Sequence, residues 1–157
     1  MAINTLEELF IHDLSDVYSA EKQITRALPK MARAATDEKL VAAFQQHLDE
    51  TQGQIERLDQ LVETTEGVHI KRMKCHALEG LVEEAQEIIE SVVAGPVRDA
   101  GLIGAAQKVE HYEIATYGTL HALALKLGYK TAAQLLAETL KEEKATDEKL
   151  SAIAAHQ

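Results

Sequence analysis

Apolar side chains recur along most of this chain with a period close to 3.6 residues, the period of an α-helix packed against a core. The first such segment begins at Thr5, which with Glu8 has the spacing of a capping box. Its apolar stripe continues to Met31. Pro29 lies inside the stripe, so we expect a kink or an early end of the helix there. No segment alternates with a period of two for long, and the pattern predicts an all-α protein.

Residues that start and stop helices divide the rest of the chain. Thr36 or Asp37 is the expected cap of the second helix, and Gly67 is its expected stop. A shorter third helix has a clean apolar stripe over residues 78–92. Gly95 and Pro96 follow this helix. Gly95 is the expected end of the third helix, and Pro96 is the expected start of the fourth, because proline suits the first helical position.

The last two helices are separated by a single turn. The fourth helix extends to Gly128, a typical C-terminal glycine. Thr131 and Gln134 have the spacing of a second capping box, which predicts that the fifth helix opens there and runs to near the C-terminus.

The lengths of the connections predict the topology. Short connections make the first and second helices, and the fourth and fifth, antiparallel hairpins. About thirty residues containing the third helix lie between the hairpins. Two hairpins joined by one long crossover form a ferritin-like four-helix bundle, here with an extra helix in the crossover. We expect a single domain over residues 1–157.

The composition of the chain indicates which partners and which cellular compartment to expect. Sixteen Lys and Arg against 26 Asp and Glu give a net charge of −10, and Trp is absent, so no nucleic-acid partner is expected. No apolar run approaches the roughly 20 residues of a membrane span, and we expect no membrane partner. An acidic opening segment without a signal peptide and a single cysteine, Cys75, favour a cytoplasmic protein.

Several acidic residues and one histidine lie on the apolar stripes, where solvated groups are not expected. Burying a carboxylate without a partner costs several kcal/mol, so either these groups are less buried than the stripes imply or a cation holds them. The residues are Glu21, His47, Glu50, Glu110, Glu113, Glu143 and Asp147.

Their positions along the two hairpins indicate a common level. Residues equidistant from the turn of an antiparallel hairpin lie at the same height. Glu21 and Glu50 are centred on the first connection, and Glu113 and Glu143 on Gly128. Each lies about 15 to 18 residues from its turn, or roughly 22–27 Å along the helix. Both hairpins therefore place acids at about mid-height.

Carboxylates from four helices with a histidine one turn away are what a dinuclear metal site requires. Carboxylate oxygens suit Fe and Mn, so two Fe or Mn ions are the predicted cofactors. Six carboxylates against two divalent ions leave a charge near −2, which favours oxidised ions, an indirect role for one acid, or a nearby cation such as Arg57. Asp147 and His47 rank below the glutamates as direct ligands. Tyr117 is either a core tyrosine or a residue that supports the ligands.

The residues around His69, Cys75 and His76 could suggest zinc, but one cysteine in a Lys-rich loop is a poor ligand set. A solvated loop is the favoured interpretation.

Long segments of the chain resemble the ferritin-like YciE/YciF family of bacterial stress proteins, and the YciF branch in particular. The resemblance runs nearly end to end and is carried by residues 15–35, 46–63, 71–91, 105–129 and 137–150. It implies a ferritin-like bundle, a cytoplasmic location, a homodimer and a part in stress responses. The family's metal-site pattern maps onto AEK at Glu21, HLDE at His47 and Glu50, EHYE at Glu110 and Glu113, and EEKATD at Glu143 and Asp147. The resemblance implies no particular reaction.

Two functions fit these observations. The first is a dinuclear Fe or Mn protein that acts on a small oxidant, either peroxide or dioxygen. The alternative is a non-catalytic, dimeric stress protein in which metal is structural or absent. In that case the third helix would be the working part, covering an edge of the bundle or a neighbour.

Overall fold

The structure is a computed structural model that describes residues 2–156. It contains five helices over these residues: α1 (Leu6–Ala34), α2 (Glu38–Thr64), α3 (His76–Ser91), α4 (Pro96–Leu127) and α5 (Lys130–Ala155). No strand occurs in this part of the chain. The predicted all-α class is confirmed.

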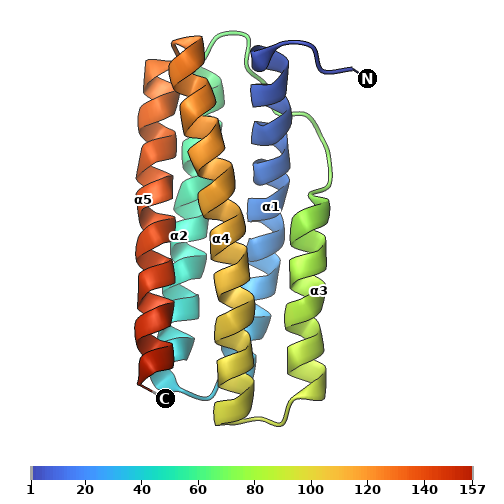
Figure 1. Cartoon of the computed structure of the whole chain (residues 1–157), viewed down its shortest axis with the longest axis vertical. Coiled ribbons are helices and arrows are strands. Elements are labelled where there is room, and N and C mark those ends of the chain that lie inside the picture. The colour runs from blue at the N-terminus through green and yellow to red at the C-terminus, as the bar shows by residue number, and fades with distance from the viewer. Residues whose placement is uncertain (1, 157) are drawn as a thin grey trace.

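The helices are arranged as two antiparallel hairpins with one addition (Figure 1). The pairs α1–α2 and α4–α5 form the four-helix bundle, and α3 packs outside it against α1 and α4. Gly101 allows this approach, since a Cβ atom there would lie only 2.9 Å from Cγ2 of Ile88 on α3. The predicted bundle with an extra helix in the crossover is confirmed.

Most helix boundaries follow the predicted signals. The Thr5 side chain accepts a 3.0 Å bond from the Glu8 amide, and Asp37 accepts bonds from the first amides of α2. Pro96 occupies the first turn of α4, and Gly128 ends that helix in the left-handed region with φ 77°. A glycine suits this conformation because it has no Cβ atom to clash.

Two helix ends differ from the prediction. Pro29 does not end α1, which continues to Ala34 because Leu28 and Met31 are both buried on either side of it. The second helix ends at Thr64, and Gly67 lies in the turn beyond it with φ 81°.

The predicted capping box at Thr131 and Gln134 is wrong. The fifth helix already begins at Lys130, and no side chain caps it. The Ala133 amide bonds to the carbonyl of Tyr129 at 2.9 Å, so the helical turn starts directly after Gly128.

The crossover is fixed to α1 by three polar side chains spaced four residues apart. The Lys71 amide donates to Ser15 Oγ at 2.8 Å, and the Cys75 amide donates to Ser19 Oγ at 3.1 Å. Gln23 donates to the Cys75 carbonyl at 3.1 Å. These bonds set the position of α3, since Cys75 is its N-cap residue.

The bundle core consists of two clusters of buried apolar residues. One includes Ile24, Phe44 and Leu150 together with residues of α3, and the other includes Phe10, Leu58 and Leu136. The acidic residues of interest lie along the helices between these clusters. None of the described helices combines the length and apolar character needed to span a membrane.

Candidate metal centre

Four of the predicted site residues meet in the centre of the bundle. His47 comes from α2, Glu110 and Glu113 from α4, and Glu143 from α5. Each offers one nitrogen or oxygen atom, and these atoms all lie within 4.8 Å of one another. His47 is 4% exposed, and the three glutamates are fully buried. Three helices thus bring carboxylate and imidazole groups to one point.

Glu21 of α1 adds a fourth buried carboxylate next to this group. Its Oε2 atom accepts a 3.0 Å hydrogen bond from the Tyr117 hydroxyl group. Its carboxyl group also lies close enough to that of Glu113 for the two to interact. We refer to Glu21, His47, Glu110, Glu113 and Glu143 as the central cluster.

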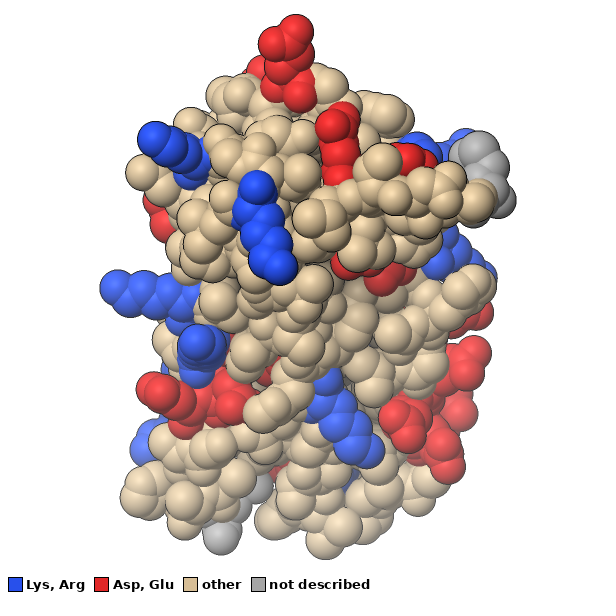
Figure 2. Space-filling view, turned by 45° about the horizontal axis from the view of Figure 1, so that its top comes forward, with Lys and Arg blue, Asp and Glu red and all other residues tan. Residues whose placement is uncertain are grey.

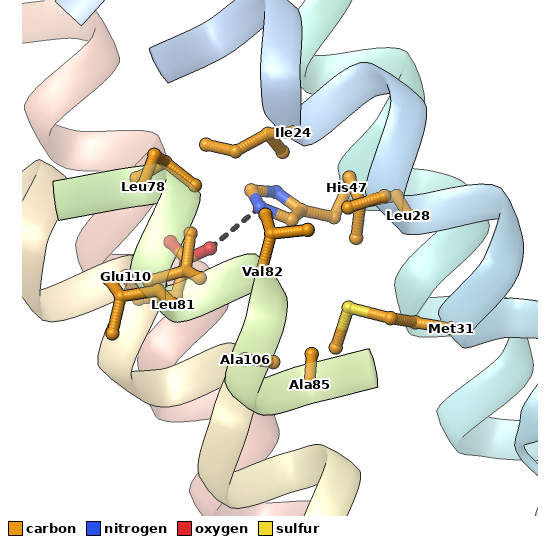
Figure 3. A pocket seen from close by; sticks show the side chains of 12 residues that line it. Ile24, Leu28, Met31, His47, Leu78, Leu81, Val82, Ala85, Ala106 and Glu110 are labelled. Atoms are coloured by element: carbon orange, nitrogen blue, oxygen red, sulfur yellow. Dashed lines mark ion pairs between the residues drawn. The ribbon is translucent and has the colours of Figure 1, made fainter. Parts of the chain in front are cut away.

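One short contact within the central cluster joins α2 to α4. Nε2 of His47 lies 2.6 Å from Oε1 of Glu110, and Figure 3 shows the imidazole ring directed at that carboxylate. Neither atom has a hydrogen bond of acceptable geometry, although the separation is short enough for one. The two atoms are therefore near neighbours that form an ion pair if His47 is protonated.

The central cluster holds most of the buried side-chain atoms of residues 2–156 that lack a hydrogen-bond partner. Ten buried side-chain N or O atoms in the part of the chain that the structure describes lack a hydrogen-bond partner. Nine of them belong to the central cluster, and the tenth is Oε1 of Gln54. Buried polar groups in folded proteins nearly always have a partner, so this concentration calls for an explanation.

Protonation is how the cluster can reduce its charge without a cation. Burial is the largest cause that raises the pKa of Glu21 and of Glu110 to about 8. Burial and the neighbouring carboxylates also raise the pKa of Glu113 and Glu143 well above the ordinary range. The protein thus presents carboxyl groups that bind protons near neutrality and would release them to a cation.

The other two predicted acids lie at the edge of this arrangement. Glu50 is partly exposed and accepts bonds from Gln46 at 3.3 Å and from Thr146 at 3.2 Å. The Asp147 side chain is 20% exposed and contacts His111 at 3.2 Å and Gln107 at 3.3 Å. In the structure His47 lies inside the central cluster and Glu50 at its edge, although the sequence favoured Glu50 over His47 as a direct ligand.

Arg57 contacts an acid next to the central cluster rather than the cluster itself. Its guanidinium group makes two 2.7 Å bonds to Glu142 and a 3.2 Å bond to Thr139. Gln54 donates to the same Glu142 carboxylate at 3.1 Å. These contacts tie α2 to α5 directly beside Glu143.

Gln54 and Glu142 were not among the predicted site residues. Gln54 lies on the buried stripe of α2, one turn after Glu50, which was a usable signal. Glu142 gives no such signal, because only the packing of α5 against α2 shows which partner it meets.

The central cluster is separate from the surface charges. Figure 2 shows acidic and basic side chains interspersed over one face of the protein. The four carboxylates of the central cluster, in contrast, are fully buried. Within residues 2–156, no second group of three or more His, Cys, Asp or Glu residues has this convergence.

The residues considered for zinc do not come together. His69 and His76 are exposed, whereas Cys75 is fully buried and its Sγ atom lies 3.1 Å from the Tyr112 hydroxyl group. His69 lies in a solvated loop as expected, His76 is an exposed residue at the start of α3, and Cys75 belongs to the core.

The donor set of the central cluster fits two divalent cations. Four carboxylates carry a charge of −4 when ionised, which two divalent ions balance. Carboxylate oxygens with one imidazole nitrogen are ligands suited to Fe and Mn. The unpartnered atoms of all five residues are the observation that a bound metal would explain.

These features define the class of protein: a ferritin-like helical bundle with a buried carboxylate–histidine cluster that could hold metal. The chain belongs to the family described as Domain of unknown function (DUF892), whose model matches residues 5–157. It is 65% identical over 154 residues to Protein YciF of Escherichia coli strain K12, covering 98% of this chain and 93% of that protein. The predicted resemblance to the YciE/YciF family is confirmed.

Solved structures agree with this assignment. The crystal structure of the E. coli stress protein YciF matches with a TM-score of 0.96 at 65% identity, covering 98% of this chain and 96% of that one. YcfI from Rhodopseudomonas palustris matches with a TM-score of 0.91 at 46% identity, covering 95% and 94%. A protein from Xanthomonas campestris pv. campestris, with a TM-score of 0.77 at 24% identity over 97% and 93%, shares the fold.

Proposed function

We propose that the central cluster binds two Fe or Mn ions and that the loaded protein acts on peroxide or dioxygen. The observation that carries the proposal is nine buried N or O atoms on the five residues of the central cluster that have no hydrogen-bond partner and could bind metal. A pair of such ions, when bound, supplies the two electrons that reduction of an O–O bond takes up.

The residues of this chain have definable parts in that function. The central cluster supplies the ligands, and its carboxylates release protons as they bind cations. The Tyr117 hydroxyl group holds one oxygen of Glu21 and leaves the other free. Apolar clusters on both sides limit the contact of the ligands with bulk water, which strengthens their attraction for cations.

Metal analysis with a matched pair of variants tests the binding step. Glu143→Ala removes a ligand of the central cluster, and Glu148→Ala removes an exposed glutamate from the same helix. We expect about two ions per chain in the wild type and in Glu148→Ala, and a marked loss in Glu143→Ala. Unchanged content in Glu143→Ala, or no metal in the wild type after reconstitution, would contradict the proposal.

Oxidant consumption then separates the proposed function from a structural role for the metal. Loaded wild-type protein and Glu148→Ala should consume peroxide or dioxygen, and folded Glu143→Ala should not. If chelation lowers the melting temperature but loaded protein consumes neither oxidant, the metal is structural.

We also infer a homodimer, supported by the family resemblance. Val93 and Val97, at the connection between α3 and α4, are 74% and 64% exposed and are apolar side chains that a second copy could cover. Light scattering tests this inference, and a monomeric mass would contradict it.

A further inference from the structure

A small apolar cavity lies beneath α3, directly beside the central cluster. Figure 3 shows side chains from α1, α3 and α4 around it, with the imidazole ring of His47 directed at Glu110. Ten of its twelve lining residues are apolar, and His47 and Glu110 are the only polar ones. The cavity is thus an apolar space that borders the proposed metal site.

The size of the cavity limits what it can hold. The centre of a water-sized molecule can move through about 20 Å³ of it. About 10–15 Å³ of such space is enough for one water-sized molecule, whereas drug-sized ligands need pockets of hundreds of Å³. The cavity therefore has room for a single di- or triatomic molecule.

The lining determines which small molecule is favoured. A buried water needs two to four polar partners, and most of this surface offers none. Hydrogen peroxide would likewise give up hydrogen bonds to bulk water on entering. Dioxygen has no hydrogen bonds to lose and gains from leaving water.

A second cavity reaches His47 from the opposite side and has the opposite character. It lies between α2 and α5, has about 70 Å³ of the same kind of space, and is lined by Gln46, Glu50, Thr146 and Lys149 among others. Water, peroxide and cations have polar partners there. The apolar cavity is therefore not needed for polar solutes.

We propose that the cavity beneath α3 binds one molecule of dioxygen beside His47 and Glu110. The binding of a small apolar molecule rests on the cavity alone, and its use as an oxidant rests on the proposed function. Under the proposed function, the oxidant that reaches the metal site from this side is dioxygen rather than peroxide.

The test uses metal-free protein under dioxygen pressure, so that binding is measured without turnover. Dioxygen is paramagnetic and speeds the relaxation of nearby methyl groups, which methyl NMR detects. We expect a larger effect at Ile24 and Leu78, which line the cavity, than at Leu120 and Leu136, which are as deeply buried in the other apolar cluster. Equal effects at the two pairs would overturn the proposal.

Two neighbouring alanines of α4 provide a matched pair of variants. Ala106 lines the cavity and Ala105 does not, and both are buried. Ala106→Val should abolish the excess relaxation by filling the space, and Ala105→Val should retain it. Retention of the excess in folded Ala106→Val would overturn the proposal.

Val82→Ala is the second variant, in case Ala106→Val does not fold. It removes two methyl groups from the α3 side of the cavity, and xenon, which binds dry apolar cavities, should bind more tightly than to the wild type. No increase in xenon affinity would count against the assignment.

Turnover by loaded protein distinguishes failure of this inference from failure of the proposed function. Dioxygen consumption should be slower in Ala106→Val than in Ala105→Val, whereas peroxide consumption should be equal in the two. If the excess relaxation is present but loaded wild type consumes neither oxidant, dioxygen binding stands and the proposed oxidant chemistry fails.

Discussion

The hydroxyl group of Tyr117 donates a 3.0 Å hydrogen bond to Oε2 of Glu21, joining α4 to α1 where both side chains are fully buried. This bond leaves Oε1 of Glu21 as the oxygen without a hydrogen-bond partner. Tyr117 is therefore placed to orient Glu21 whether or not a cation is bound.

Tyr117→Phe tests this role. It leaves both oxygens of Glu21 without a partner, and we expect metal-free stability to fall by about 1–3 kcal/mol. Metal affinity should also fall, because Glu21 is no longer held in place. Urea unfolding and metal titration measure the two effects.

Tyr112→Phe is the control, because Tyr112 bonds to Asp16 and Cys75 outside the central cluster. It should lower stability without changing metal affinity. A Tyr117→Phe protein that binds metal as tightly as Tyr112→Phe would show that Tyr117 is not a positioning residue.

The raised pKa values of the central cluster predict how stability varies with pH in metal-free protein. Glu21 and Glu110 have a pKa of about 8 in the folded state against an ordinary value of 4.5. Between these values the folded protein keeps protons that the unfolded chain has lost, so stability is greatest below the lower value and falls as pH rises to about 8.

Each such group contributes a slope of up to about 1.4 kcal/mol per pH unit. Urea midpoints in the presence of chelator, from about pH 5 to about pH 8, measure it. Glu113→Gln should give a shallower slope, because glutamine has no proton to lose. A midpoint that stays level or rises across this range in the wild type would contradict the prediction.

The pair Arg57–Glu142 predicts a coupling between α2 and α5. The two side chains are 25% and 29% exposed and meet through two 2.7 Å bonds. We expect Arg57→Gln to destabilise the protein by about 1 kcal/mol, since bidentate and partly buried pairs exceed the usual surface value.

A double-mutant cycle with Glu142→Gln measures the coupling directly, and we expect about 0.5–1.5 kcal/mol. Arg57→Lys should recover only part of the loss, because an ammonium group cannot make the paired contact. Additive effects of the two single substitutions would show that the contact contributes nothing.

Sequence reasoning predicted the mid-height meeting of acids, because the positions of residues in a hairpin follow from counting to the turn. It could not rank His47 against Glu50. They are three residues apart on α2, and an apolar stripe about 100° wide leaves both on its face. The exact rotation of α2, set by packing against α1 and α5, turns His47 inward and leaves Glu50 partly exposed.

The docking position of α3 also could not be predicted from the sequence. A long crossover is compatible with several docking positions, and connection length does not choose among them. Hydrogen bonds to the crossover from Ser15, Ser19 and Gln23 fix the docking position of α3. Polar residues at intervals of four beside an apolar stripe were a signal that periodicity analysis did not use.

Asp99 shows another contact that only the tertiary structure explains, and it predicts a large loss of stability. This residue of α4 is 2% exposed and accepts bonds from the Thr36 amide, the Thr36 hydroxyl group and the Asp37 amide. Asp99→Ala leaves these donors unpaired, and we expect a loss of about 2–4 kcal/mol in urea unfolding.

Asp99→Asn keeps an acceptor oxygen and should lose less. Asp37→Ala removes a single helix cap and should cost about 1 kcal/mol. An effect of Asp99→Ala no larger than that of Asp37→Ala would show that the connection between α1 and α2 does not depend on this carboxylate.

The bonds from α1 to the crossover predict a local effect on α3. Ser19→Ala removes the acceptor for the Cys75 amide, which precedes the first turn of α3. Because α3 packs outside the four-helix bundle, its opening need not unfold the rest. We expect faster amide hydrogen exchange over residues 75–91, with exchange in α2 and α5 unchanged.

Thr25→Ala is the control, since the Thr25 hydroxyl group bonds within its own helix to the Lys22 carbonyl. If exchange in α3 rises no more in Ser19→Ala than in Thr25→Ala, the bond from Ser19 does not hold α3 in place, and the remaining bonds from Ser15 and Gln23 together with the apolar packing of α3 fix the helix.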